Sequence, residues 1–169
     1  MFKHAIALAS LTAVALFAGQ AIAASPATTT FQVKLNIEAA CTVAASDVDF
    51  GTHDSSDRNI RSSSNIKVTC TKNTPYTIGL LPSNSDATGA GVMLRSGGAS
   101  TNPADLVAYK LYSDSARQNA WGNSTGAGGN VVPDIGTGAA TTHKVYAVAS
   151  SANSAAGTYL DTVTVTVNY

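Results

Sequence analysis

The chain has 169 residues, enough for one domain after a leader is removed, and its 10 Lys and Arg residues balance 10 Asp and Glu residues. This balance excludes an overall basic field of the kind that binds nucleic acid, and it excludes an acidic tail. Only 12% of the residues are charged. The abundance of Thr, Ser, Ala, Val and Gly is typical of short strands and turns rather than helices.

Residues 1–23 predict a secretory signal peptide. Lys3 precedes an apolar stretch, residues 5–18, and small residues follow up to Ala23. A membrane anchor is the alternative, but the apolar stretch is shorter than the roughly 20 residues that a span needs, and it ends in small rather than basic residues. We therefore expect cleavage after Ala23, secretion, and no membrane span in the mature chain.

Residues 24–37 form an N-terminal extension that ends in a clear strand pattern. Large apolar residues alternate with Gln32, Lys34 and Asn36. The apolar residues are Phe31, Val33, Leu35 and Ile37. Such a strand has one apolar face, which needs a hydrophobic surface to cover. The pattern leaves two alternatives open: the strand begins its own domain, or it covers a neighbouring molecule.

The chain has two cysteines, Cys41 and Cys70. In an oxidising compartment we expect them to form a disulfide, worth roughly 3 to 4 kcal/mol in the chain-entropy model. Residues 66–70 alternate in polarity, so Cys70 shares a face with Ile66 and Val68. The disulfide is therefore predicted on the core side of that strand.

Short strands and polar turns continue along the chain. A short extended piece at residues 48–51 is followed by a polar segment, residues 52–64, that predicts a loop. Further strands are predicted at residues 66–71, 76–81, 92–94, 106–112 and 143–149, with a Gly-rich loop at residues 122–130.

The last predicted strand runs from Thr158 to the end of the sequence. Its odd positions are apolar except for Asp161. These apolar positions are Tyr159, Val163, Val165, Val167 and Tyr169. Because six to eight short strands occur without helical periodicity, we expect an all-β, immunoglobulin-like antiparallel β-sandwich.

No group of residues predicts catalysis. Residues 53–56, His-Asp-Ser-Ser, contain the residue types of a catalytic triad, but neighbours in a polar loop do not adopt its geometry. The Gly-rich run 126–129 neither opens a helix nor ends in Lys-Ser/Thr, as a phosphate site requires. Asp47 and Asp49 lie on one side of a short predicted strand, and we interpret them as solvated turn residues rather than as a sugar-hydrolysing pair.

Metal and cofactor sites are not expected either. His53 and His143 are isolated in the sequence, and no Cys-x-x-Cys spacing occurs. Trp121 has the chemistry to stack on a sugar, together with Tyr109 and Tyr112, but core packing is the favoured interpretation. The residues therefore predict a secreted structural or binding protein and not an enzyme.

Several blocks of the sequence match a known family. They are the leader, the alternating strand before Cys41, Phe50-Gly51, Val68-Thr-Cys70, Tyr109-Lys-Leu111-Tyr112-Ser-Asp114, Arg117, Trp121-Gly122, and the terminal block from Ala156 to Tyr169. Together they resemble the spore coat protein U domain family, which includes the archaic chaperone–usher pilins of the Csu type. The Trp-Gly block and the terminal Gly-x-Tyr-x-Asp block are the most specific parts of the resemblance.

The resemblance implies that residues 38–169 form a pilin-like domain, an immunoglobulin-like sandwich that lacks its final strand. A groove then lies open beside the C-terminal strand, residues 158–169. A periplasmic chaperone fills this groove first, and the donor strand of the next subunit replaces it at an outer-membrane usher. The resemblance thus favours the second alternative for residues 31–37.

The function implied is that of a structural subunit of a secreted cell-surface fibre that supports adhesion and biofilm formation. Its partners are a periplasmic chaperone, an outer-membrane usher, and neighbouring copies of itself or of related pilins. Two alternatives stay open: a spore coat structural protein of the same family, and a tip adhesin that binds a surface or sugar. The single domain argues against the adhesin.

Overall fold

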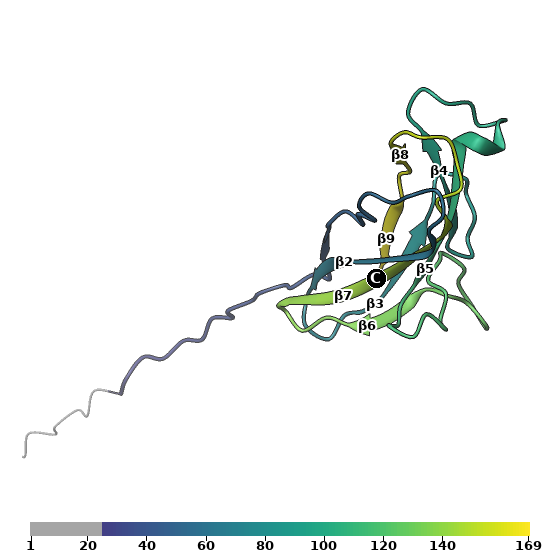
Figure 1. Cartoon of the computed structure of the whole chain (residues 1–169). Coiled ribbons are helices and arrows are strands. Elements are labelled where there is room, and N and C mark those ends of the chain that lie inside the picture. The colour runs from purple at the N-terminus through teal and green to yellow at the C-terminus, as the bar shows by residue number, and fades with distance from the viewer. Residues whose placement is uncertain (1–24) are drawn as a thin grey trace, which may run out of the picture. The chain divides into compact units, whose positions relative to one another are not determined.

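The computed structural model describes residues 25–169, and the predicted signal peptide, residues 1–23, lies outside the described residues. The chain divides after Leu35 into two units. Residues 25–35 contain no strand or helix and are drawn as a purple trace without an arrow in Figure 1. All the strands belong to the unit of residues 36–169.

Residues 36–169 form two antiparallel β-sheets (Figure 1). The larger sheet has six strands in the order β1-β2-β7-β5-β4-β8, and the smaller has three in the order β6-β3-β9. In chain order the strands are β1 Cys41–Ala45, β2 Arg58–Cys70, β3 Pro75–Leu81, β4 Ala90–Arg95, β5 Leu106–Tyr112, β6 Val132–Ile135, β7 Ala140–Ser151, β8 Tyr159–Leu160 and β9 Thr164–Asn168. The described residues contain one 3₁₀ turn, Pro103–Asp105, and no α-helix.

The core is built from alternate residues of strands in both sheets, since successive side chains of a strand point to opposite faces. Its buried apolar members form one cluster. They are Ile60, Ile66, Val68, Cys70, Tyr76, Ile78, Leu80, Val107, Tyr109, Leu111, Trp121, Val145, Ala147 and Ala149. Trp121 is 1% exposed, and its indole Nε1–H donates to the carbonyl oxygen of Ile78 at 2.9 Å. The all-β sandwich and the core role of Trp121 are therefore confirmed.

The predicted loop over residues 52–64 is wrong in its second half, because β2 begins at Arg58 and pairs with β7 as far as Ser151. Two serines face the inside of this half. The Ser64 hydroxyl donates to the carbonyl oxygen of Ser46 at 2.7 Å, and the Ser62 hydroxyl donates to that of Asp49. These partners satisfy the polar side chains, so a serine-rich segment continues the strand.

The predicted extended piece at residues 48–51 is not a strand in the structure. Its backbone instead accepts the serine hydroxyls of β2, and the Asp49 carboxylate accepts the N–H of Gly51 at 2.7 Å. Asp47 and Asp49 therefore do not share a strand face. Asp49 has the turn role that the sequence favoured.

The single strand predicted from Thr158 onward is also wrong, because it is two strands on different sheets. In β8, Leu160 pairs with Leu94 of the larger sheet, whereas in β9 Val165 pairs with Leu80 of the smaller sheet. The crossing occurs at Asp161, the one polar residue among the odd positions. By contrast, the strand predicted at residues 106–112 coincides with β5.

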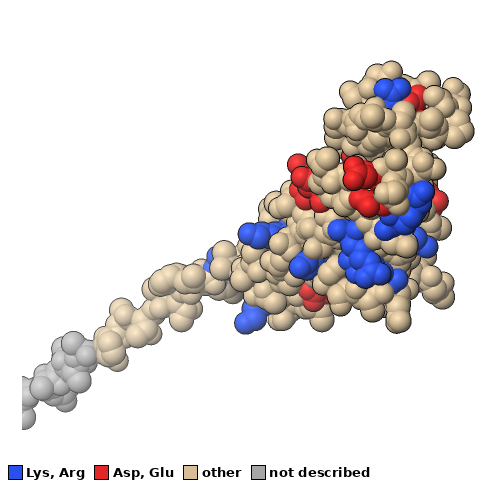
Figure 2. All heavy atoms as spheres, in the orientation of Figure 1, with Lys and Arg blue, Asp and Glu red and all other residues tan. Residues whose placement is uncertain are grey.

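Charged side chains of both signs occur on the face shown in Figure 2, separated by uncharged residues. Within residues 25–169, no helix has the length and apolar character needed to cross a membrane.

Candidate strand-acceptor site

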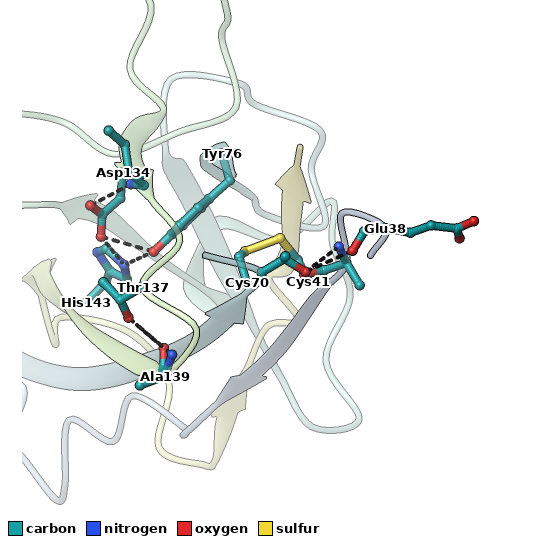
Figure 3. The surroundings of a disulfide bond; sticks show 11 residues. Glu38, Cys41, Cys70, Tyr76, Asp134, Thr137, Ala139 and His143 are labelled. Atoms are coloured by element: carbon teal, nitrogen blue, oxygen red, sulfur yellow. Dashed lines mark hydrogen bonds and ion pairs between the residues drawn. A yellow bond between two sulfur atoms is a disulfide. The ribbon is translucent and has the colours of Figure 1, made fainter. Parts of the chain in front are cut away.

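The predicted disulfide is confirmed: Cys41 of β1 and Cys70 of β2 are directly opposite each other and are joined by an S–S bond (Figure 3). Cys70 is 2% exposed, so the bond lies on the core side. It fastens the first strand of the domain to the long β2 strand.

Hydrogen bonds to Thr71 hold the residues just before β1. The Thr71 hydroxyl donates to the carbonyl oxygen of Glu38 at 3.1 Å and accepts the N–H of Ala40 at 3.1 Å. The Thr71 N–H donates to the carbonyl oxygen of Ala40 at 2.9 Å. These hydrogen bonds therefore fix the path by which the chain enters β1.

Two sheet edges lie next to each other without a ladder of hydrogen bonds between them. β1 ends the larger sheet and pairs only with β2, while β9 ends the smaller sheet and pairs only with β3. The two edge strands are in contact. Each edge presents backbone N–H and C=O groups that lack a strand partner on one side.

The inward-facing side chains at these two edges are poorly covered. Val43 of β1 is opposite Val68 of β2 and so shares its inner face, yet Val43 is 43% exposed and Val68 only 1%. On β9, Val165 and Val167 are half-buried although their partners on β3, Leu80 and Ile78, are 1% and 0% exposed. We call the strip formed by Val43, Val163, Val165 and Val167 the open edge.

The predicted groove residues occupy different places in the structure. Val163 precedes β9, Val165 and Val167 lie on it, and Tyr169 follows it with a 62% exposed side chain. Tyr159 lies on β8 in the larger sheet, where its hydroxyl donates to the carbonyl oxygen of Ala155 at 2.5 Å. The structure therefore brings the valines together at the open edge and places Tyr159 on another strand.

The predicted donor residues have no cover in the structure. The exposed fractions of Phe31, Val33, Leu35 and Ile37 are 86%, 87%, 84% and 73%. Soluble proteins rarely expose large apolar side chains in a contiguous row.

A buried hydrogen bond sets the position of β9. The Tyr109 hydroxyl of β5 donates to the Asp161 carboxylate at 2.5 Å, and the Thr162 N–H donates to the same carboxylate at 2.8 Å. Burial, and then the Asp161 hydrogen bond, raises the pKa of Tyr109. The sequence did not identify this pair, and its only signal was the break at Asp161 in an apolar row.

His53 and Asp57 are paired titratable side chains outside the open edge. His53 Nδ1 is 2.9 Å from Asp57 and its Nε2 is 2.8 Å from the carbonyl oxygen of Phe50, so both ring nitrogens are engaged. The hydrogen bond to the Asp57 carboxylate, and then that to the Phe50 carbonyl oxygen, raises the pKa of His53. This arrangement stabilises a turn. Neither ring nitrogen is free to act as a general base for a nucleophile.

His143 is isolated in the sequence but not in space. Tyr76 Oη lies 3.0 Å from both Asp134 Oδ2 and His143 Nε2, and the last two atoms are 3.3 Å apart (Figure 3). Burial and the Asp134 hydrogen bond raise the pKa of Tyr76. Because Tyr76 and Asp134 belong to the smaller sheet and His143 to the larger, the cluster links the sheets. Across residues 25–169, no three His, Cys, Asp or Glu residues are grouped as a metal site requires.

The fold is a two-sheet antiparallel domain in which inward-facing side chains of the edge strands β1 and β9 are partly exposed. The Spore Coat Protein U domain model matches residues 27–166, and the chain belongs to this family. It is also similar to Protein U of Myxococcus xanthus, with 31% identity over 179 aligned positions that cover 96% of this chain and 97% of Protein U.

Two solved structures share the fold. One is the CsuC–CsuE chaperone–tip adhesion subunit pre-assembly complex from the archaic chaperone–usher Csu pili of Acinetobacter baumannii, with a TM-score of 0.53, 24% identity, and 79% of this chain covered. The other is a chaperone–tip adhesin complex of CFA/I fimbriae biogenesis, with a TM-score of 0.50, 13% identity and 75% coverage. This chain spans 40% of the matched chain in each.

Proposed function

We propose that the protein is a structural subunit of a cell-surface fibre, polymerised by donor-strand exchange. The observation that carries the proposal is the open edge, where inward-facing Val43 is 43% exposed beside the unpaired edge of β9. The same chain carries an alternating apolar segment whose side chains are 73% to 87% exposed. If the alternating segment of one molecule pairs with the open edge of another, both sets of exposed apolar side chains become buried.

The two surfaces match in length and period. The donor segment has apolar residues at alternate positions of residues 31–37, and the C-terminal segment has them at alternate positions of residues 163–169. Side by side, such strands place their apolar side chains on one face and exchange backbone hydrogen bonds. Chaperone–pilin complementation is an established example of this kind of strand addition.

The connection between the donor segment and β1 favours a neighbouring molecule as the acceptor. To lie beside its own β1, the segment needs a chain reversal between Ile37 and Cys41. The hydrogen bonds from Thr71 hold Glu38 and Ala40 in the path that leads into β1. Self-complementation therefore requires these bonds to break, whereas insertion into another copy does not.

The energy available is large enough to control stability. Burying four large apolar side chains at roughly 1.5 to 3 kcal/mol each gives an upper value of about 6 to 12 kcal/mol before ordering costs. That is comparable with the roughly 5 to 15 kcal/mol stability of an ordinary domain. A subunit without a donor is thus expected to be unstable and prone to aggregate through its open edge. Because donor and acceptor are different surfaces, the contact propagates head to tail into a fibre.

The proposal includes a periplasmic chaperone that covers the open edge before assembly and an outer-membrane usher where the next donor strand replaces it. The family membership and the structural similarity to chaperone–subunit complexes support these partners. Secretion through the periplasm, display on the cell surface, and a role in adhesion and biofilm formation belong to the same proposal. The role is structural rather than enzymatic.

A spore coat structural protein is the second candidate, favoured by the description of the family and by the similarity to Protein U over nearly the full chain. Immunogold labelling of whole cells and of spores separates the two candidates. Label along filaments on growing cells supports the fibre, whereas label confined to the spore surface supports the coat.

Donor-strand exchange is tested with the mature protein prepared with and without residues 24–37. We expect the full mature chain to form SDS-resistant ladders and the truncated chain to sediment as a labile monomer. A synthetic peptide of residues 31–37 should raise the melting temperature of the truncated chain, while the same peptide carrying Leu35→Lys should not. If both proteins are monomeric and only the longer one is stable, the strand completes its own domain and the proposal fails.

A further inference from the structure

The outer face of the larger sheet concentrates positive charge in a chain whose total charge is balanced. β2, β5 and β7 contain no Asp or Glu, although the chain has 10 acidic residues. Their outward positions carry Arg61 and Lys67 on β2, Lys110 on β5 and Lys144 on β7. In Figure 2, blue side chains gather over the region where these strands lie in Figure 1, with red ones beside them.

The strand register brings these cations together. Arg61 and Lys110 both pair with Val148 of β7, one from each side, so the three residues form a row across the sheet. The next row along β7 contains Tyr146, which is opposite Tyr112 of β5. Because outward residues of adjacent strands lie about 5 Å apart, the cations and tyrosines share one continuous surface.

Tyrosine rings contact three cations, Lys110, Arg117 and Lys144, without neutralising them. Lys144 Nζ and Arg117 Cζ each lie 5.6 Å from the centre of the Tyr146 ring, and Lys110 Nζ lies 6.0 Å from that of Tyr112. Arg117 follows β5 and has a positive φ of 58°. Cation–π contacts orient these groups and leave their full charge available to a ligand. We call Arg61, Lys67, Lys110, Arg117 and Lys144 the basic face.

Carboxylates near the basic face have other partners. Asp86 accepts the Thr88 N–H at 2.7 Å, and Asp114 accepts the N–H of Asn119 at 2.7 Å. Lys110 contributes to the lowered pKa of Asp86 but forms no ion pair with it. Within residues 25–169, none of the five cations of the basic face lies within 4.0 Å of a carboxylate oxygen.

We propose that the basic face binds an acidic polysaccharide, meaning a sugar chain with repeated carboxylate groups. Ser63, Asn65 and Thr142 also point outward among the cations and supply hydrogen-bonding groups for sugar hydroxyls. Single-stranded nucleic acid is the other anionic polymer to consider, but it stacks its bases on open aromatic faces. On Tyr146 the ring is occupied by Lys144 and Arg117. The combination of cations and short polar side chains therefore fits a sugar chain better.

The test measures binding of the full mature chain to immobilised polygalacturonate, uncharged dextran and DNA. We expect binding to polygalacturonate at about 50 mM NaCl that is at least about tenfold tighter than to dextran and is lost at about 0.5 M NaCl. The variant Lys110→Gln with Lys144→Gln should weaken it by about tenfold or more.

The control variant, Arg58→Gln with Lys72→Gln, removes the same charge away from the basic face and should change the affinity by less than about twofold. Sedimentation and thermal melting of all three proteins ensure that oligomeric state and stability are equal. Equal losses in both variants show a dependence on net charge alone and overturn the proposal. The proposal is also overturned if dextran binds as tightly as polygalacturonate. Tighter binding to DNA that depends on Lys110 and Lys144 overturns it as well.

Discussion

Val43 and Val68 are directly opposite each other on β1 and β2, yet Val43 is 43% exposed and Val68 is 1% exposed. Both side chains point to the inner face of the sheet, so the difference arises from what lies above them. Val68 belongs to the buried core cluster, which includes residues of both sheets, whereas Val43 lies on β1, an edge strand in contact with the edge strand β9. This pair of residues marks the place where we propose that a strand from a neighbouring subunit binds.

A charge on the apolar face of the donor segment is expected to prevent polymerisation. In the proposed donor-strand exchange, Leu35→Lys would place an ammonium group against the open edge of the next subunit, where its burial is strongly unfavourable. The yield of SDS-resistant polymer should fall by more than about tenfold. Gln32→Lys, on the polar face of the same segment, is the matched control and should polymerise normally. Electron microscopy and gel ladders measure both; normal fibres from Leu35→Lys contradict donor-strand exchange.

Removing the disulfide is expected to destabilise the domain without changing its fold. Cys41→Ser with Cys70→Ser frees a loop with a sequence separation of 29 residues. The loss should be about 3 kcal/mol, or a melting temperature lower by about 10 °C. The decrease in melting temperature is measured by calorimetry, with the peptide of residues 31–37 present in every sample. Reduced wild-type protein should have the same melting temperature as the double variant. A difference between the two would point to an effect of the serines themselves.

The Trp-Gly block is expected to be intolerant of a side chain at Gly122. A Cβ atom there would lie 2.1 Å from the carbonyl oxygen of Ala87 and 2.7 Å from the backbone N of Gly89. Because both obstacles are backbone atoms, Gly122→Ala should cost about 3 kcal/mol or more. Gly126→Ala is the control: it meets no atom within 4 Å but has a φ of +89°, so about 1 kcal/mol is expected from backbone strain. Denaturant unfolding distinguishes the two, and equal losses would rule out crowding as the cause.

Alkaline pH is expected to destabilise the fold through its buried tyrosines. The folded-state pKa of Tyr109 is raised, mainly by burial and then by Asp161, and that of Tyr76 is raised as well. The folded protein therefore keeps protons that the unfolded chain loses above about pH 10. Stability is complete below that pH and falls above it, by up to about 1.4 kcal/mol per pH unit for each such tyrosine, until the pH passes the folded-state pKa of that tyrosine. Tyr109→Phe should reduce this slope by one proton, measured by denaturant unfolding between about pH 9 and 11.5; an unchanged slope would mean that Tyr109 ionises alike in both states.

Local patterns predicted the strands whose own residues alternate. Residues 106–112 form β5 as expected, and the inward positions of residues 66–70 are buried as their alternation predicts. The start of β2 was not predictable in this way, because its inner serines are satisfied by carbonyl groups of residues 46 and 49. Those partners are brought near only when the chain has folded.

The sheet crossing at Asp161 has a similar cause. The residue interrupts an apolar row, and the row alone suggested one continuous strand. Its carboxylate accepts the hydroxyl of Tyr109, which is 52 residues earlier in the chain. A partner that distant cannot be inferred from the period of the last segment.

The sequence by itself determined which side chains share a face within the strands that alternate strictly, such as residues 66–70 and 106–112, that the two cysteines pair, and which family the chain belongs to, because these depend on local spacing and residue type. The tertiary structure decided which faces are covered. Val43, Val165 and Val167 alternate like core residues, and only the placement of β1 beside β9 shows that they remain partly exposed. Whether a side chain is buried depends on strands that are far apart in the sequence. A local sequence pattern does not indicate which of those strands become neighbours.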